Sequence, residues 1–120
     1  MGKDTVVIGA SPNFERYSYK ATVRLNQYGH KVYPVGLREG KIEGIDILTD
    51  KPGIQNVNTV TLYVGPQNQE AWKEYIFSLK PKRIIFNPGT ENPKFEMEAQ
   101  AKGIECVEAC TLVMLSVGNY

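Results

Sequence analysis

The chain has 120 residues, of which 42% are hydrophobic and 22% are charged, and its formal net charge at pH 7 is +1. This length predicts one ordinary domain over residues 1–120, and so balanced a charge gives no general attraction to nucleic acid or to an acidic membrane. No apolar stretch reaches the ~20 residues that span a bilayer and no secretory signal opens the chain, so we expect a cytoplasmic protein without membrane contact.

The first elements along the chain are expected to be a strand, a helix and a second strand. Residues 5–8 form a short, β-branched apolar run that ends at Gly9, which is typical of a strand buried on both faces. Apolar side chains then recur at helical spacing from Tyr17 to Tyr28, and Gly29 is suited to end this helix. The second strand is expected over residues 31–35. Together these elements have the size of a βαβ unit.

The same alternation continues to the end of the sequence. Further strands are expected at 59–64, 83–86 and 104–107. One helix is expected between Asn68 and Pro81, another from Asn92 to Gly103, and a short closing helix near 111–115. The least regular segment is 36–58, where we expect a short strand or turn near 42–48 and then a brief helix.

This pattern predicts an α/β fold, namely a single Rossmann-like domain with a five-stranded parallel sheet, strand order 3-2-1-4-5 and helices on both faces. Ligands of such sheets bind beyond the carboxyl ends of the strands, where the loops at 9–11, 35–36, 65–66 and 87–89 are expected. Gly9 would let the backbone approach a phosphate, and the N–H groups of Ala10 and Ser11 could hold its charge. The same loop residues would also suit turning alone.

The first of these loops resembles a known family. The segment GASPNFERYSY, residues 9–19, is similar to the GASxNxxRxSY pattern of small CoA-binding proteins, a family related to the CoA-binding domain of nucleoside-diphosphate-forming acyl-CoA synthetases. The pair Pro34-Val35 and the segment Glu108-Ala-Cys-Thr111 also match, so the resemblance spans essentially the whole chain. It departs at Phe14 and Tyr17, where relatives often carry proline, and at residues 36–37, where PVNP is common.

The resemblance implies a stand-alone module that binds coenzyme A or an acyl-CoA through this GAS loop. The pyrophosphate would lie on the loop, helped by Arg16 and by serine hydroxyls, and Arg38 with nearby Lys41 could meet the 3′-phosphate. Arg38 and Lys41 also suit a solvated surface loop. The residues expected to contact the cofactor are Gly9, Ala10, Ser11, Arg16, Ser18, Tyr19, Val35, Arg38, Val64, Gly65, Pro66, Asn87, Pro88 and Gly89.

Two alternatives stay open. The end of the second strand has no carboxylate to hold a ribose and the chain lacks GxGxxG, which argues against NAD, but Arg38 leaves an NADP-type dinucleotide possible. A small thiol-dependent enzyme could use Cys110, which follows a strand end near a helix start, although this thiol also suits a small buried apolar group. His30 is expected in a turn away from the ligand edge, and two cysteines alone make no metal site. We assign no catalytic residue and no metal, favour a binding module over an enzyme, and leave any protein partner open.

Overall fold

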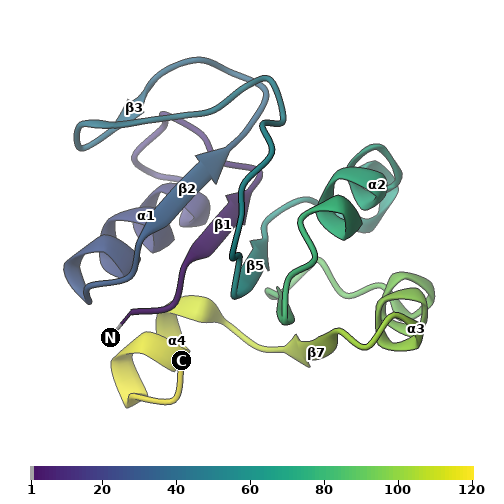
Figure 1. Cartoon of the computed structure of the whole chain (residues 1–120). Helices are drawn as coiled ribbons and strands as arrows, with labels where there is room; N and C mark the ends of the chain where they lie inside the picture. The colour runs from purple at the N-terminus through teal and green to yellow at the C-terminus, as the bar shows by residue number, and fades with distance from the viewer. Residues whose placement is uncertain (1) are drawn as a thin grey trace.

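The computed structural model describes residues 2–120, and its centre is a five-stranded parallel sheet (Figure 1). In spatial order the strands are β2 (Val32–Val35), β1 (Thr5–Ile8), β5 (Thr59–Leu62), β6 (Arg83–Phe86) and β7 (Glu105–Glu108). Every neighbouring pair is parallel. The predicted α/β class and the five-stranded parallel sheet are therefore confirmed.

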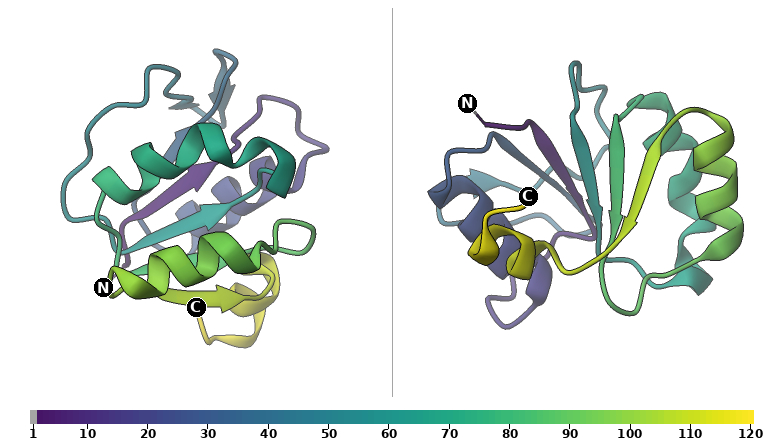
Figure 2. Two further views of the ribbon diagram at one scale, coloured as in Figure 1. Left: turned by 90° about the vertical axis from the view of Figure 1, so that its right-hand side faces the viewer. Right: turned by 90° about the horizontal axis from the view of Figure 1, so that it is seen from below.

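Helices cover both faces of this sheet, as the views in Figure 2 show. On one face lie α1 (Tyr17–Gln27) and α4 (Thr111–Val117), which contact each other, and on the other lie α2 (Glu70–Ser78) and α3 (Pro93–Ala101). A short 3₁₀ turn, η1 (Pro66–Asn68), precedes α2. The longest helix among residues 2–120 has 11 residues, and none of them has the length and apolar character of a membrane span.

Each face of the sheet packs its own hydrophobic core. Between the sheet and α2 with α3 lie side chains such as Ile8, Leu62 and Phe86, which contact Ile76 and Phe95. On the other face a smaller core joins Val7, Leu25, Ile42, Ile47 and Leu115. All residues of β1, β5 and β6 are buried because helices cover both faces, which explains why these short strands, apart from Arg83 at the start of β6, consist of apolar or β-branched residues.

The segment 36–58 differs from the expectation. A small antiparallel hairpin forms from β3 (Lys41–Ile42) and β4 (Ile45–Asp46), but the brief helix expected after it is wrong. The Pro52-Gly53 pair disfavours a helix there, and Lys51 and Asn56 both have positive φ angles, 48° and 61°. The chain instead crosses the sheet edge as an irregular loop.

This loop also decides how the strands are arranged. Leu48 forms a single parallel bridge with Val35 on the outer side of β2, and the chain then crosses to β5, which pairs with β1. When the bridge at Leu48 is counted as the third strand, β5 and β6 become the fourth and fifth, and the order from Leu48 to β6 is the predicted 3-2-1-4-5. When only the five full strands are numbered in chain order, their order along the sheet is 2-1-3-4-5.

Candidate functional site

The carboxyl ends of β1, β2, β5 and β6 open onto one cavity of about 900 Å³. Most of the residues predicted to contact a cofactor line it, namely Gly9, Ala10, Ser11, Arg16, Ser18, Arg38, Val64, Gly65, Pro88 and Gly89. Loops that are far apart in the sequence meet here because parallel strands end at the same edge of the sheet. The volume lies within the ~300–1,000 Å³ range of ligand and cofactor sites.

Gly9 makes the sharp turn that starts the cavity wall. Its φ angle is +94°, in the region that favours glycine, and an added Cβ would lie 3.0 Å from the carbonyl oxygen of Tyr63. The N–H groups of Gly9 and Ala10 both donate to the carbonyl oxygen of Val35 at 3.0 Å. The Ala10 N–H, which was predicted from the sequence to hold a phosphate, therefore already has an acceptor within the protein. Among residues 2–120 no acceptor contacts the Ser11 N–H, which leaves this donor available.

The stretch between Ser11 and α1 is held by its own hydrogen bonds. The Asn13 N–H donates to Oγ of Ser11 at 3.1 Å, and Oδ1 of Asn13 accepts from the Glu15 N–H at 3.0 Å. The Arg16 N–H donates to the Asn13 carbonyl oxygen at 3.0 Å. No side chain caps α1 and no acidic residue lies in its first turn, so its first N–H groups have no side-chain acceptor. Arg16, Tyr17 and Ser18, at the start of α1, line the cavity.

Gly36, which the sequence placed in one of the strand-end loops and which departs from the family pattern, packs against the GAS loop without lining the cavity itself. An added Cβ would lie 2.2 Å from the carbonyl oxygen of Ala10, far inside any real contact. The Gly36 N–H donates to the Leu48 carbonyl oxygen at 3.0 Å. The end of β2 thus lies directly against the GAS loop, and only glycine permits this approach.

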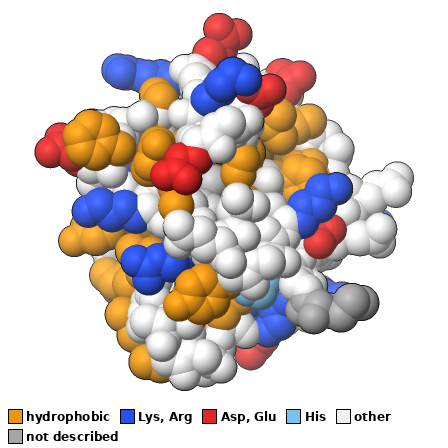
Figure 3. Space-filling model, turned by 90° about the vertical axis from the view of Figure 1, so that its left-hand side faces the viewer, with side chains coloured by type: hydrophobic (Ala, Val, Ile, Leu, Met, Phe, Trp, Pro, Cys, Tyr) orange, Lys and Arg blue, Asp and Glu red, His pale blue; other side chains and the backbone are white. Residues whose placement is uncertain are grey.

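The charges that line the cavity are mainly positive. Arg16 and Arg38 are both exposed and line it, whereas Glu15 is the only lining carboxylate among the described residues. Lys41 does not line the cavity, and its Nζ pairs with Asp46 at 2.9 Å within the β3–β4 hairpin. On the molecular face that carries α1 and this hairpin, basic and acidic side chains are interspersed rather than gathered into one patch (Figure 3). Attraction of an anion therefore depends on the local pair of arginines.

Several apolar and aromatic residues of the wall were not predicted from the sequence. Tyr17 and Leu37 line the cavity with 67% and 81% of their surfaces exposed, and Tyr63 and Trp72 form deeper parts of it. Trp72 lies in the core with 4% of its surface exposed. Lys51 links the loop before β5 to the start of α2, since its Nζ donates to the carbonyl oxygen of Ala71 at 2.8 Å and lies 4.6 Å from the Trp72 ring centroid. Burial raises the pKa of Tyr63 well above its usual value, so the phenol stays neutral.

Four of the expected cofactor-contacting residues do not line the cavity. Val35 is completely buried in the core beneath α2, and Tyr19 packs against the core beneath α1. Pro66 is exposed at the start of η1. The fourth residue, Asn87, is buried with 1% exposed. Val35, Pro66 and Asn87 lie at or after strand ends and Tyr19 lies in α1, but none of the four lines the cavity.

Asn87 holds three elements together. Its Nδ2 donates to Oγ1 of Thr61 at 2.7 Å and to the carbonyl oxygen of Leu62 at 2.9 Å. Its Oδ1 accepts from the backbone N–H of Thr111 at 2.9 Å. Asn87 thereby ties the end of β6 to β5 and to the start of α4, which fixes the loop that carries Pro88 and Gly89.

The thiols and the histidine lie outside the cavity lining. Cys110 precedes α4, and burial raises the pKa of Cys106 to about 11. Nδ1 of His30 accepts from the Lys3 N–H at 2.9 Å, at the opposite end of the sheet. Within residues 2–120 no three His, Cys, Asp or Glu side chains gather as metal ligands.

A parallel sheet covered on both faces, with a cavity beyond its strand ends and a glycine turn after the first strand, defines a Rossmann-like binding domain. A family model described as a CoA binding domain matches residues 3–116, and the chain belongs to this family. The family that the sequence resembles is thereby confirmed.

Solved structures share this fold. The crystal structure of an uncharacterized protein superposes with a TM-score of 0.97 at 50% identity, covering 100% of this chain and 99% of that one. A hypothetical protein from Pyrococcus horikoshii OT3 gives 0.83 at 23% identity, with 97% and 83% covered. A dinucleotide forming acetyl-coenzyme A synthetase from Ca. Korarchaeum cryptofilum, in complex with phosphate and ADP, gives 0.70 at 17% identity, with 90% of this chain matching 26% of that protein. No curated protein matches the chain.

Proposed function

We propose that this chain is a stand-alone binding module for coenzyme A or an acyl-CoA, and that the ligand lies in the cavity at the carboxyl edge of the sheet. The observation that carries the proposal is that a chain of the CoA binding domain family gathers its GAS loop, the start of α1 and two arginines around this one cavity. An anionic nucleotide is the ligand that such a combination favours.

The diphosphate is assigned to the GAS loop and the start of α1. The Ser11 N–H is available, and because Oγ of Ser11 accepts from Asn13, its own O–H can still donate to a phosphate oxygen. The uncapped N–H groups of α1 add further donors, and Arg16 lies beside them with a charge that cannot be lost at physiological pH.

The adenosine 3′-phosphate is assigned to Arg38. This side chain follows β2 on the other side of the GAS loop and lines the cavity without an ion pair among the described residues. The less polar pantetheine arm is assigned to the wall made by Val64, Gly65, Trp72 and Pro88, where few charged groups compete.

Isothermal titration with CoA, dephospho-CoA, NADP and NAD tests the proposal. We expect CoA to bind most tightly. In Arg38→Ala, CoA should lose about 1.5–3 kcal/mol, the worth of a hydrogen bond to a charged group, while dephospho-CoA is almost unaffected. Lys41→Ala is the matched control, because this nearby cation pairs with Asp46 and does not line the cavity.

Tighter binding of NADP or NAD than of CoA would overturn the assignment of the ligand. Equal weakening of CoA and dephospho-CoA by Arg38→Ala would move Arg38 to the diphosphate or to the fold. Native mass spectrometry of the purified protein complements the titration, since a mass matching CoA or a thioester of it would show which acyl group accompanies the chain.

A further inference from the structure

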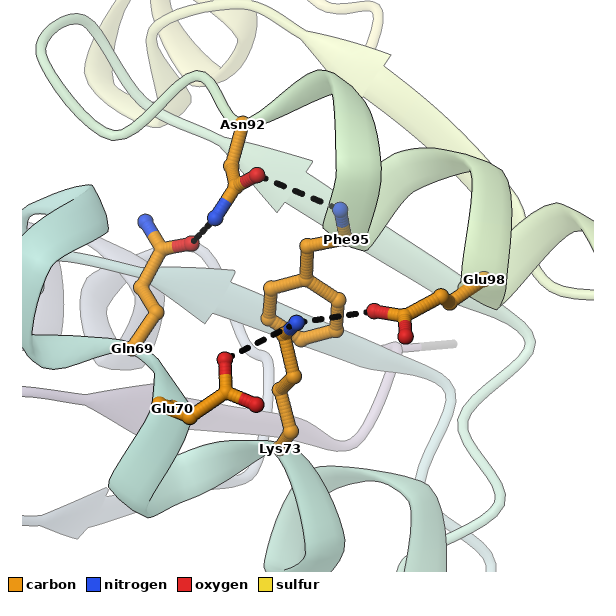
Figure 4. Close-up of polar contacts among 6 residues, drawn as sticks. All are labelled: Gln69, Glu70, Lys73, Asn92, Phe95 and Glu98. Carbon is orange, nitrogen blue, oxygen red and sulfur yellow. Dashed lines mark hydrogen bonds and ion pairs between the residues drawn. The ribbon is translucent and has the colours of Figure 1, made fainter.

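One polar side chain lies completely buried beside the cavity wall. Gln69, at the N-terminal end of α2, has 0% of its surface exposed (Figure 4). Its Nε2 donates to the carbonyl oxygens of Val64 and Thr90 at 2.8 and 2.7 Å, and its Oε1 accepts from Nδ2 of Asn92 at 2.9 Å. A buried amide with both N–H groups and its oxygen satisfied is a strong constraint on the backbone around it.

The two carbonyl groups belong to different walls of the same cavity. Val64 follows β5 and Thr90 follows β6, and both line the cavity. Within its own loop Thr90 is held by Asn87, whose carbonyl oxygen accepts from the Thr90 N–H at 2.9 Å and from its Oγ1 at 2.8 Å. The Gln69 amide is therefore a direct link that joins the two loops.

These hydrogen bonds also determine which side chain can occupy position 69. Backbone carbonyl groups only accept, so the position needs two N–H donors on one side and an acceptor toward Asn92 on the other. Oδ1 of Asn92 in turn accepts from the Phe95 N–H at 3.2 Å and caps α3. An amide meets all these requirements, whereas a carboxylate or an apolar side chain of the same size leaves both carbonyl oxygens unpaired.

We propose that Gln69 is a positioning residue that sets the spacing of the loops after β5 and β6, and through them the affinity of the cavity for its ligand. The inference rests on the proposed function, because it concerns the same cavity. It adds a residue that does not touch the ligand and that lies outside the cavity lining.

Lys73, one turn further along α2, offers a matched control. It is also buried, with 7% exposed, and Nζ pairs with Glu98 at 2.8 Å and with Glu70 at 3.1 Å (Figure 4). Nζ lies 5.4 Å from the Phe95 ring centroid. Lys73 therefore joins α2 to α3 much as Gln69 does, but its side chain bonds to neither cavity loop.

The test compares Gln69→Met with Lys73→Met in two measurements. The first is CoA affinity by titration. Gln69→Met should bind CoA about tenfold more weakly than wild type, which corresponds to a loss of about 1.4 kcal/mol in binding free energy. Lys73→Met should bind CoA as wild type does. The second is amide hydrogen exchange without ligand, which should become faster at residues 64–65 and 89–91 in Gln69→Met alone.

Equal CoA affinity in the two variants, with unchanged exchange in both loops, overturns the positioning role. If wild type itself does not bind CoA, the proposed function fails, and the exchange measurement still decides whether Gln69 holds the loops. Should Gln69→Met not fold, Gln69→Glu replaces it. Its CoA affinity should improve relative to wild type as the pH falls and the carboxyl group gains one donor, and a pH profile identical to that of wild type counts against the inference.

Discussion

The contact between Gly36 and the GAS loop leads to the sharpest prediction, for Gly36→Ala. The new Cβ would lie 2.2 Å from the carbonyl oxygen of Ala10, and real Cβ contacts with backbone essentially never fall below 3.0 Å, so the end of β2 and the loop must separate by most of an ångström. The hydrogen bonds from Gly9 and Ala10 to Val35, both 3.0 Å long, run across the same gap and would be lost. At about 0.5–1.5 kcal/mol each, their loss predicts a decrease of about 1–3 kcal/mol in the free energy of unfolding.

Urea unfolding measures this change, and CoA titration measures its effect on the cavity. Gly53→Ala is the matched control, since nothing lies within 4 Å of its added Cβ and its φ angle is not positive. That control should leave stability unchanged or raise it by up to about 1 kcal/mol through a less flexible unfolded chain. If Gly36→Ala unfolds at the same urea concentration as Gly53→Ala, the argument from close approach is refuted.

Three further predictions concern single side chains. Burial and the charge of Lys3 lower the pKa of His30, so the folded state binds fewer protons than the unfolded state and stability should fall as the pH drops below about 6.5. Urea unfolding across that pH range should show the fall, and His30→Gln should remove this part of the pH dependence. Asn87→Leu should cost about 2–3 kcal/mol in urea unfolding because Asn87 makes three buried hydrogen bonds, whereas Asn26→Leu on the exposed face of α1 should cost little. Burial raises the pKa of Cys106 to about 11, so peptide mapping after alkylation at about pH 8 should find it unmodified until the chain unfolds.

Local patterns along the chain were enough to predict most of the fold. The run at residues 5–8 and the run at 83–86 became β1 and β6 with the same bounds, because a short β-branched segment between turn residues has few other ways to bury itself. The helix capped by Asn92 could also be predicted from the sequence, since Oδ1 of Asn92 caps it and Pro93 occupies its first turn. The GAS segment identified the family, and its loop lies at the carboxyl edge of the sheet, where the cavity opens.

The details of the site were decided by contacts between segments distant in sequence. Nothing local indicates that the Ala10 N–H is taken by Val35, that Trp72 reaches the cavity from α2, or that the Gln69 amide joins the loops after β5 and β6. Which N–H groups remain free for a ligand depends on where each strand end lies against its neighbour. That placement follows from the packing of the whole sheet between its helices, and it cannot be predicted from the spacing of residues in the sequence.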